Sequence, residues 1–251
     1  MARAAKSSAK KKKVATPKSK RSFAQRIADA RAFVRRWVVR GALAALVLGM
    51  GWILLYTVVD PKKSRYMRAE ERRIGAIDHS WVPMGEIAPV MARSVVAAED
   101  ANYCNHWGFD MSAIRAAVDA GGTRGASTLS QQVVKNVYLW HGRSYARKAL
   151  EALMTPLVEL TWSKRRILEV YLNVAEFDEG IFGVEAAARH YFGVGPADLS
   201  ATQSARLAAI LPSPKTRSAS RPSPFVRKRA SQIVDGAATI RRDGRAACFQ
   251  D

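Results

Sequence analysis

The sequence predicts a mainly α protein that begins with a single transmembrane helix. Helix start and stop signals punctuate residues 60–251, and no convincing run of alternating apolar and polar residues predicts a sheet. Residues 41–59, GALAALVLGMGWILLYTVV, contain no charge. A bilayer core needs about 20 apolar residues in a helix, so this run is long enough to span one. We therefore divide the chain into a tail (1–40), an anchor (41–59) and an outer domain (60–251), which we expect to form two lobes around a cleft.

The basic tail gives the expected orientation. Residues 1–40 hold fourteen Lys and Arg against Asp29, within a formal net charge of +20 for the chain. The positive-inside rule places this tail in the cytoplasm and residues 60–251 across the membrane. Residues 1–20 are nearly without large apolar groups, so we expect them to be disordered. Their lysine run would also suit nonspecific nucleic-acid binding, but beside an anchor it is better explained by topology and by attraction to anionic headgroups.

A cleaved signal peptide is the main alternative to an anchor. Its apolar region would be shorter, about 7–15 residues, and small residues would mark a cleavage site after it. The segment after Leu55, Tyr-Thr-Val-Val-Asp-Pro-Lys, lacks such a site. A buried core helix is also a poor explanation, because it would not be apolar all round after a basic tail of forty residues. We therefore predict an uncleaved anchor.

Eight helices are expected in the outer domain from the residues at their ends. A proline or a capping side chain starts most of them, and glycine or proline follows several. Pro156 should bend or interrupt the longest. The expected helices are Val90–Asp100 after Pro89, Met111–Asp119 between Asp110 and the pair Gly121 and Gly122, one from Thr128 to about Tyr138, one from Ser144 to about Trp162, one from Ser163 to Asn173, Val184–Tyr191 before Gly193, one from Ser200 to before Pro212, and one starting near Pro224.

The two cysteines, Cys104 and Cys248, do not have the spacing of a metal site, so zinc is not indicated. They either pair with each other or remain two free thiols. The sequence does not decide between these states.

A pair of acids at a helix end is the first candidate site. Glu99 follows an apolar run, and this setting, the helix C-terminus and the neighbouring Asp100 would all raise its pKa, as suits a general base. The residues alone favour a solvated acidic pair on a surface helix over a catalytic one. His106, between Asn105 and Trp107, is expected to hold a loop through its ring nitrogens.

A second cluster leads into a predicted helix N-terminus, whose free N–H groups favour an anion. Ser127 and Thr128 precede this helix, while Gln131 and Lys135 share one of its faces. Together these four could hold a phosphate or sugar hydroxyls. A capped helix with a polar outer face explains them equally well, and the order is not that of a P-loop.

A third cluster places Arg147 and Lys148 four and three residues before Glu151. An exposed salt bridge on a helix is the simpler explanation. A basic residue before an acidic one is the weaker order on a helix, which slightly favours phosphate binding by the two cations.

Four stretches occur in the order and spacing of a known family. They are Glu99-Asp-x-x-Tyr-x-x-His106-x-Gly108, GASTLSQQVVKN (125–136), RKALE (147–151) and KRRILEVYLN (164–173). Together they resemble the peptidoglycan glycosyltransferases of family 51, which include the transglycosylase domains of class A penicillin-binding proteins and stand-alone biosynthetic enzymes. The resemblance covers roughly residues 80–240. No transpeptidase domain follows, so the chain looks like a monofunctional member.

The resemblance implies a lysozyme-like, two-lobed helical fold and the polymerisation of lipid II into glycan strands by inverting glycosyl transfer. It implies that Glu99 is the general base. Glu151 would be a second catalytic carboxylate that positions a divalent cation, Mg²⁺ or Mn²⁺, or the leaving group. The positions that the resemblance assigns to substrate binding are Asp100, His106, Ser127, Thr128, Gln131, Lys135, Arg147 and Lys148.

The resemblance also implies where the protein works. We expect a single-pass protein of the bacterial inner membrane with a periplasmic catalytic domain. Its partners would be lipid II, the growing glycan strand, membrane lipids and other cell-wall synthases, but not nucleic acid. The nearest alternative enzyme is a lysozyme-like peptidoglycan hydrolase or lytic enzyme, which also uses carboxylates in a helical cleft. The cations around Glu151 favour a pyrophosphate substrate instead, and a silent membrane scaffold is the alternative outside the enzymes.

Overall fold

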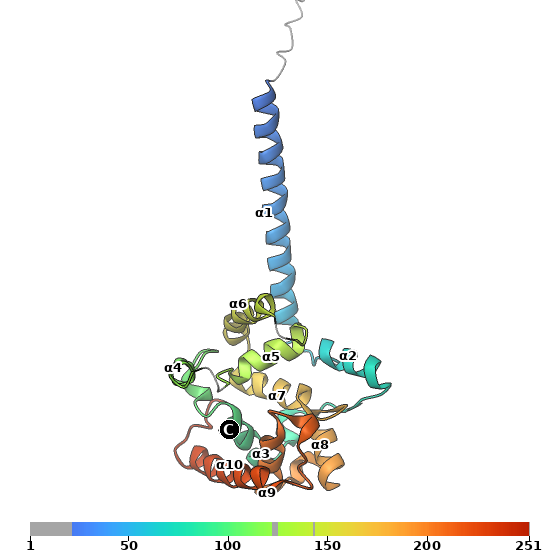
Figure 1. Cartoon of the computed structure of the whole chain (residues 1–251), viewed down its shortest axis with the longest axis vertical. Helices are drawn as coiled ribbons and strands as arrows, with labels where there is room; N and C mark the ends of the chain where they lie inside the picture. Colours follow the sequence, from blue (N-terminus) through green and yellow to red (C-terminus); the bar gives the residue numbers. More distant parts are fainter. Residues whose placement is uncertain (1–21, 122–124, 143, 251) are drawn as a thin grey trace, which may run out of the picture. The chain divides into compact units, whose positions relative to one another are not determined.

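The computed structural model of the chain describes residues 22–121, 125–142 and 144–250. It divides the chain into two compact units, Met1–Gly49 and Met50–Asp251. The described part is mainly α with very little sheet, as predicted (Figure 1). The expected disorder of residues 1–20 and the expected helix stop at Gly122 lie outside the described residues.

The first helix, α1, spans Phe23–Leu55. Among the described residues it is the one helix that is long and apolar enough, by length and composition, to cross a membrane. The helix begins within the basic tail and ends before Val59, so it is longer than the predicted anchor, whose bounds of 41–59 within the membrane stay a prediction. Residues 56–58 form a turn and Val59 a bend before Pro61.

The eight predicted helices of the outer domain are all present in the predicted order. Thr128 and Ser200 form capping boxes with Gln131 and Gln203, and Ser144 and Ser163 accept hydrogen bonds from the first turns of their helices. The helix that contains Pro156 is not interrupted. The bounds are α3 Pro89–Glu99, α4 Met111–Asp119, α5 Leu129–Tyr138, α6 Tyr145–Thr161, α7 Lys164–Val174, α8 Gly183–Phe192, α9 Ala201–Ile210 and α10 Pro224–Arg242.

One further helix, α2 (Arg65–Ile74), was not predicted. Five of its ten residues, RYMRAEERRI, are arginine or alanine, which favour helix, but it has no apolar stripe. Its buried residues are Met67 and Glu70. Ser64 caps it by accepting a hydrogen bond from the Met67 amide at 3.1 Å.

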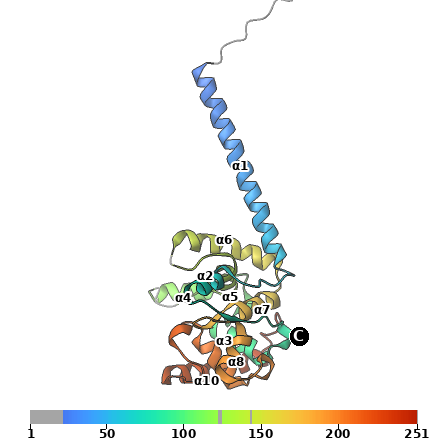
Figure 2. The same cartoon turned by 90° about the vertical axis from the view of Figure 1, so that its right-hand side faces the viewer.

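The second unit packs its helices in two groups. Helices α3, α9 and α10 pack against one another, while α5 packs against α6 and α7. Figures 1 and 2 show α10 and α6 at opposite ends of this unit, with α7 between them. A small sheet of β1 (Asp78–His79), β3 (Ile181–Phe182) and β2 (Glu176–Asp178), in that order, lies against α8; β1 pairs parallel to β3 and β2 antiparallel to it. Short 3-10 turns occupy Met84–Glu86, Tyr103–Asn105, Pro196–Asp198 and Pro214–Thr216.

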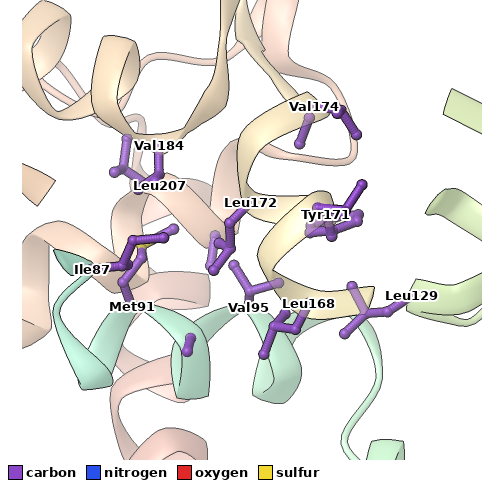
Figure 3. Packing of buried hydrophobic residues seen from close by; sticks show 14 of the residues in the cluster. Ile87, Met91, Val95, Leu129, Leu168, Tyr171, Leu172, Val174, Val184 and Leu207 are labelled. Carbon is purple, nitrogen blue, oxygen red and sulfur yellow. The ribbon is translucent and has the colours of Figure 1, made fainter. Parts of the chain in front are cut away.

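A continuous apolar core joins the two helix groups. Val95 of α3, Leu129 of α5 and Leu168 of α7 are each fully buried in it (Figure 3). Tyr171 of α7 lies in the same cluster. Burial at these positions fixes α3 and α5 relative to each other, and these two helices carry the candidate site.

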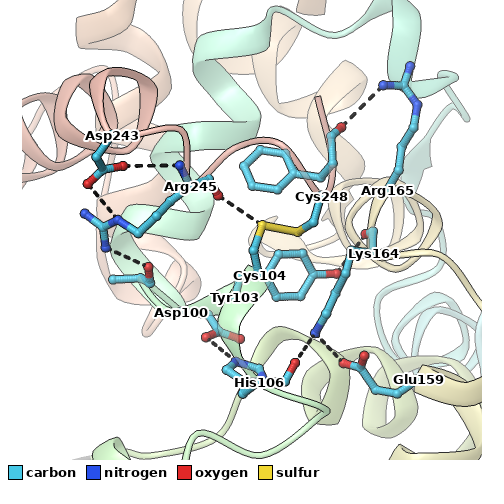
Figure 4. Close-up of a disulfide and its surroundings, with 12 residues drawn as sticks. Asp100, Tyr103, Cys104, His106, Glu159, Lys164, Arg165, Asp243, Arg245 and Cys248 are labelled. Carbon is cyan, nitrogen blue, oxygen red and sulfur yellow. Dashed lines mark hydrogen bonds and ion pairs between the residues drawn. A yellow bond between two sulfur atoms is a disulfide. The ribbon is translucent and has the colours of Figure 1, made fainter. Parts of the chain in front are cut away.

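The C-terminal segment holds α3 at both ends. Cys248 forms a disulfide with Cys104, just beyond the C-terminus of α3, with a Cα–Cα distance of 5.7 Å (Figure 4). The sequence left open whether the two cysteines pair, and the structure shows that they do. At the other end, the Gln250 amide donates to the Pro89 carbonyl (2.6 Å) and accepts from Arg93 (2.7 Å).

Candidate active site

Glu99 is the last residue of α3 and is partly buried at the edge of a cavity of about 320 Å³. The side-chain amide of Gln132, on α5, donates to Glu99 Oε2 at 2.9 Å. Arg229, on α10, reaches the same cavity and donates to the Ala98 carbonyl at 2.9 Å. Ser127 and Thr128 also line this cavity. Glu99 is therefore not the freely solvated surface acid of the simpler explanation.

Burial raises the pKa of the Glu99 carboxyl. The hydrogen bond from Gln132 and the charges of Arg229 and Lys135 act in the opposite direction, and Asp100 adds a smaller upward effect. The carboxyl is thus destabilised as an anion by its surroundings while one amide donor keeps it oriented. A group with a raised pKa and one fixed oxygen is suited to accept a proton.

Asp100 and His106 form a supporting pair behind Glu99. Asp100 is buried, and its Oδ1 lies 2.8 Å from His106 Nε2. Its Oδ2 accepts from the backbone amide of Leu129 at 3.0 Å, in the first turn of α5. Lys164 donates to the His106 carbonyl at 2.8 Å (Figure 4). His106 accordingly holds the loop through Nε2 and not through both ring nitrogens, because Nδ1 is buried and has no hydrogen-bond partner among the described residues.

Gly108 lets this loop pass close to α6. Its φ is +82°, and a Cβ here would lie 2.6 Å from Thr155 Cγ2. The Gly108 carbonyl accepts a hydrogen bond from Thr128 Oγ1 at 2.7 Å. The glycine is needed both for the left-handed backbone and for the close approach.

The N-terminus of α5 already has an anion, the carboxylate of Asp100. Gln131 is buried, and its side-chain oxygen accepts from the Thr128 amide at 3.1 Å to complete the capping box. Gln131 thus takes the capping role, and its part in binding a ligand stays a prediction. Its neighbour Gln132 faces Glu99 instead, and with Lys135 it lines a second cavity of about 220 Å³.

Glu151 is buried between two cations of its own helix. Arg147 Nη1 lies 2.6 Å from Glu151 Oε2, and Lys148 bonds the other oxygen. Lys148 also reaches Ser127 Oγ at 3.3 Å, which ties α6 to the cavity that contains Glu99. The expected salt bridge is present, but it is not exposed, because the Glu151 side chain is only 3% accessible.

Lys135 is influenced by the charges of both acids. Burial lowers its pKa, the charges of Glu151 and Glu99 raise it, and Arg147 and Lys148 lower it further. Residues separated by up to 52 positions in the sequence thus act on one ammonium group. The three sequence clusters meet in one place, with two carboxylates and three cations beside two cavities.

Comparison with known proteins identifies the family. Residues 68–238 match the family model described as Transglycosylase. The chain belongs to the transglycosylase family. It is 59% identical over 216 residues to a biosynthetic peptidoglycan transglycosylase of Jannaschia sp. (strain CCS1), covering 86% of this chain and 90% of the relative. Relatives of the same name from Caulobacter vibrioides (86% and 98% covered) and Pseudomonas fluorescens (81% and 87%) are each 47% identical.

These matches confirm the resemblance, and they make the protein a transglycosylase enzyme rather than a silent scaffold. The divalent cation expected at Glu151 stays a prediction. Among the described residues, no group of three His, Cys, Asp or Glu side chains lies together. Both oxygens of Glu151 already contact cations, so the chain's own side chains do not form a ready site for Mg²⁺ or Mn²⁺.

Three residues of this transglycosylase site were missed in the sequence. Gln132 could have been found from its spacing, since it lies three residues before Lys135 on the same helix. Arg229 gave no local signal, because it reaches Glu99 only through the packing of α10 against α3. Tyr171, which donates to Gln132 Oε1 at 3.3 Å, lies in a stretch interpreted as scaffold.

Proposed function

We propose that this chain polymerises lipid II, a disaccharide-pentapeptide carried on undecaprenyl pyrophosphate, into peptidoglycan glycan strands. The observation that carries the proposal is a pair of side-chain links between the two acids and the cavities. Gln132 bonds Glu99 and lines a cavity with Lys135, while Lys148 bonds both Glu151 and Ser127, which lines the cavity of Glu99. The names of the relatives, biosynthetic peptidoglycan transglycosylases, support the same substrate class. A neutral glycan substrate would not require Lys135, Arg147 and Lys148.

Glu99 acts as the general base. Its carboxylate removes the proton from the 4-hydroxyl of the acceptor sugar, and that oxygen attacks the anomeric carbon of the growing strand. The bond from the anomeric carbon to the phosphate oxygen breaks as the new glycosidic bond forms, so the configuration inverts from α to β. Undecaprenyl pyrophosphate leaves with the bonding electrons. The raised pKa of Glu99 suits this proton transfer, because a base works best with a pKa near the working pH.

The cations stabilise the departing pyrophosphate. Lys135 and Gln132 line one cavity, and Arg147 and Lys148 bond the two oxygens of Glu151. Positive charge fixed where negative charge develops is among the largest contributions to catalysis in a site shielded from water. Glu151 holds these cations in place while the donor is absent. Ser127, which bonds Lys148, joins this pocket to the cavity of the base.

Several features support a periplasmic domain anchored in the inner membrane. Helix α1 has the length and composition of a membrane span. The Cys104–Cys248 disulfide is typical of oxidising compartments such as the periplasm. On α6, Leu150, Leu153 and Leu160 are exposed, which suits a surface that meets lipid.

A polymerisation assay on the full chain tests the proposal. Wild type should convert lipid II into polymer, while Glu99→Gln should lose activity by about 100-fold or more, as expected when a general base is removed. The amide keeps the size of the side chain, so circular dichroism should report an unchanged fold. Near-normal polymerisation by the variant would exclude Glu99 as the base, and shortening of finished strands by wild type would favour a hydrolase.

A further inference from the structure

A cavity of about 630 Å³ in the second unit is not part of the catalytic cluster. It lies between the last turns of α1, the helix α2 and the two residues that follow Leu139. Neither of the two carboxylates of the site lines it, and neither do Lys135, Arg147 or Lys148. Its lining is made of arginines and aromatic side chains with one acid: Trp52, Arg65, Tyr66, Arg68, Ala69, Glu70, Arg72, Trp140 and His141.

The cavity carries uncompensated positive charge. Arg65, Arg68 and Arg72 are spaced by three and four residues on α2, so they share one helix face. In the part of the chain that the structure describes, no carboxylate pairs with any of the three, although the nearby Lys63 and Arg73 both have acidic partners. Arg68 donates to the Lys63 carbonyl at 2.9 Å, which positions its guanidinium without neutralising it.

Glu70, the acidic residue that lines the cavity, does not offset this positive charge. Glu70 bonds Arg73 at 2.6 Å and Lys215 at 2.8 Å, and these contacts lower its pKa. Its negative charge is thus already shared by two cations from outside the cavity. Arginine guanidinium groups that have no carboxylate partner commonly bind phosphate esters.

Two tryptophans place the cavity at a lipid boundary. Trp52 belongs to the last turns of α1, and Trp140 follows α5; they are 39% and 40% exposed. Tryptophans with this half-exposed setting, next to the end of an apolar helix, are characteristic of the membrane–water interface. Trp52 packs edge-on against Tyr138 with ring centroids 5.2 Å apart, so its position is fixed by the core.

A stacked aromatic pair separates the cavity from the catalytic cleft. Tyr66 and His141 stack with centroids 3.5 Å apart, and both line this cavity on one side and the Lys135 cavity on the other. Tyr66 is held by a 2.5 Å hydrogen bond to Glu176. Burial and the nearby cations lower the pKa of His141 to about 4, so the ring is neutral at pH 7 and adds no charge to either side.

We propose that this arginine cavity binds the headgroup of an anionic phospholipid such as phosphatidylglycerol, and that the bound lipid fixes α2 and the Tyr66–His141 pair at the membrane surface. The proposal rests on the membrane anchoring by α1 proposed above. The Tyr66–His141 pair separates the arginines from Lys135. This separation favours a phospholipid of the bilayer as the ligand over the pyrophosphate of the substrate. The basic tail 1–40 is a separate attraction for anionic lipid, so the test needs a local measurement.

Hydrogen exchange on the full chain gives that measurement. In nanodiscs of phosphatidylcholine, adding phosphatidylglycerol should slow amide exchange in residues 65–74 and 139–142 of wild type. The variant Arg65→Gln/Arg68→Gln/Arg72→Gln should need about tenfold or more phosphatidylglycerol for the same protection, since each cation at a lipid surface contributes about 1 kcal/mol. The control Arg227→Gln/Lys228→Gln/Arg241→Gln removes the same formal charge from α10 and should behave as wild type. Equal protection in wild type and the α2 variant, or none in wild type, would overturn the proposal.

A second measurement separates the two sources of phosphate. In detergent without phospholipid, the α2 variant should polymerise lipid II with the KM of wild type. A raised KM would assign the cavity to the substrate and refute the phospholipid site. Should wild type fail to polymerise at all, the proposed function fails, while the exchange experiment still tests the lipid site.

Discussion

The hydrogen bond from Gln132 to Glu99 should set the acid limb of the enzyme's pH profile. Gln132→Met keeps the length of the side chain but removes the donor 2.9 Å from Glu99 Oε2. That donor favours the carboxylate and lowers its pKa, so its loss leaves the upward effect of burial less opposed. A hydrogen bond to a charged group contributes about 1.5–3 kcal/mol. One pKa unit corresponds to about 1.36 kcal/mol, so the pKa of Glu99 should rise by about one unit or more.

The assay is kcat/KM for lipid II polymerisation as a function of pH. A general base must be deprotonated, so activity falls as pH drops through its pKa, and a higher pKa moves this limb to higher pH. The control Gln232→Met makes the same change at an exposed position of α10 and should leave the limb in place. A limb that stays in place in Gln132→Met, or moves to lower pH, would refute the assignment of the limb to Glu99 through this bond.

Three further predictions test the pocket and the loop that supports it. Lys135→Ala should weaken binding of a pyrophosphate-bearing donor analogue by about tenfold or more, because a charge-assisted contact is lost; calorimetry that finds equal affinity would count against the pocket assignment. Gly108→Ala should lower the free energy of unfolding by about 2–5 kcal/mol, the sum of the cost of a left-handed backbone and the cost of a Cβ placed 2.6 Å from Thr155. A urea unfolding curve with an unchanged midpoint would contradict the close approach. Cys104→Ser/Cys248→Ser opens a loop between residues 144 apart and should cost about 2–5 kcal/mol in the same measurement, whereas equal stability would mean that the bond does not constrain the unfolded chain.

Local signals in the sequence predicted most of the helices. Thr128, Ser144, Ser163 and Ser200 each satisfy backbone donors at the starts of their helices, so their effect does not depend on distant residues. Ser64 gives α2 a similar cap, but the buried face of this helix is small and most of its other residues are charged. A search for apolar periodicity cannot find a helix that buries two residues.

The site was predictable in its members but not in its geometry. The spacing around Glu99, Lys135 and Glu151 identified the groups, yet only tertiary packing decides that Gln132 rather than Gln131 faces the base. The same holds for Arg229, which lies 130 residues after Glu99 and is brought there by the contact of α10 with α3. The helical period predicts which residues share a face to within about one residue. Here Gln131 caps the helix, so its neighbour Gln132 is the glutamine that faces the base.

The contacts of the C-terminal segment with both ends of α3 have a practical consequence for anyone who handles this enzyme. Phe249 is fully buried, and Gln250 bonds the first turn of the helix whose last residue is Glu99. Trimming a few residues from the carboxyl terminus, or fusing a reporter close to Gln250, would disturb the seating of that helix. Affinity tags and fluorescent proteins are therefore better attached at the amino terminus.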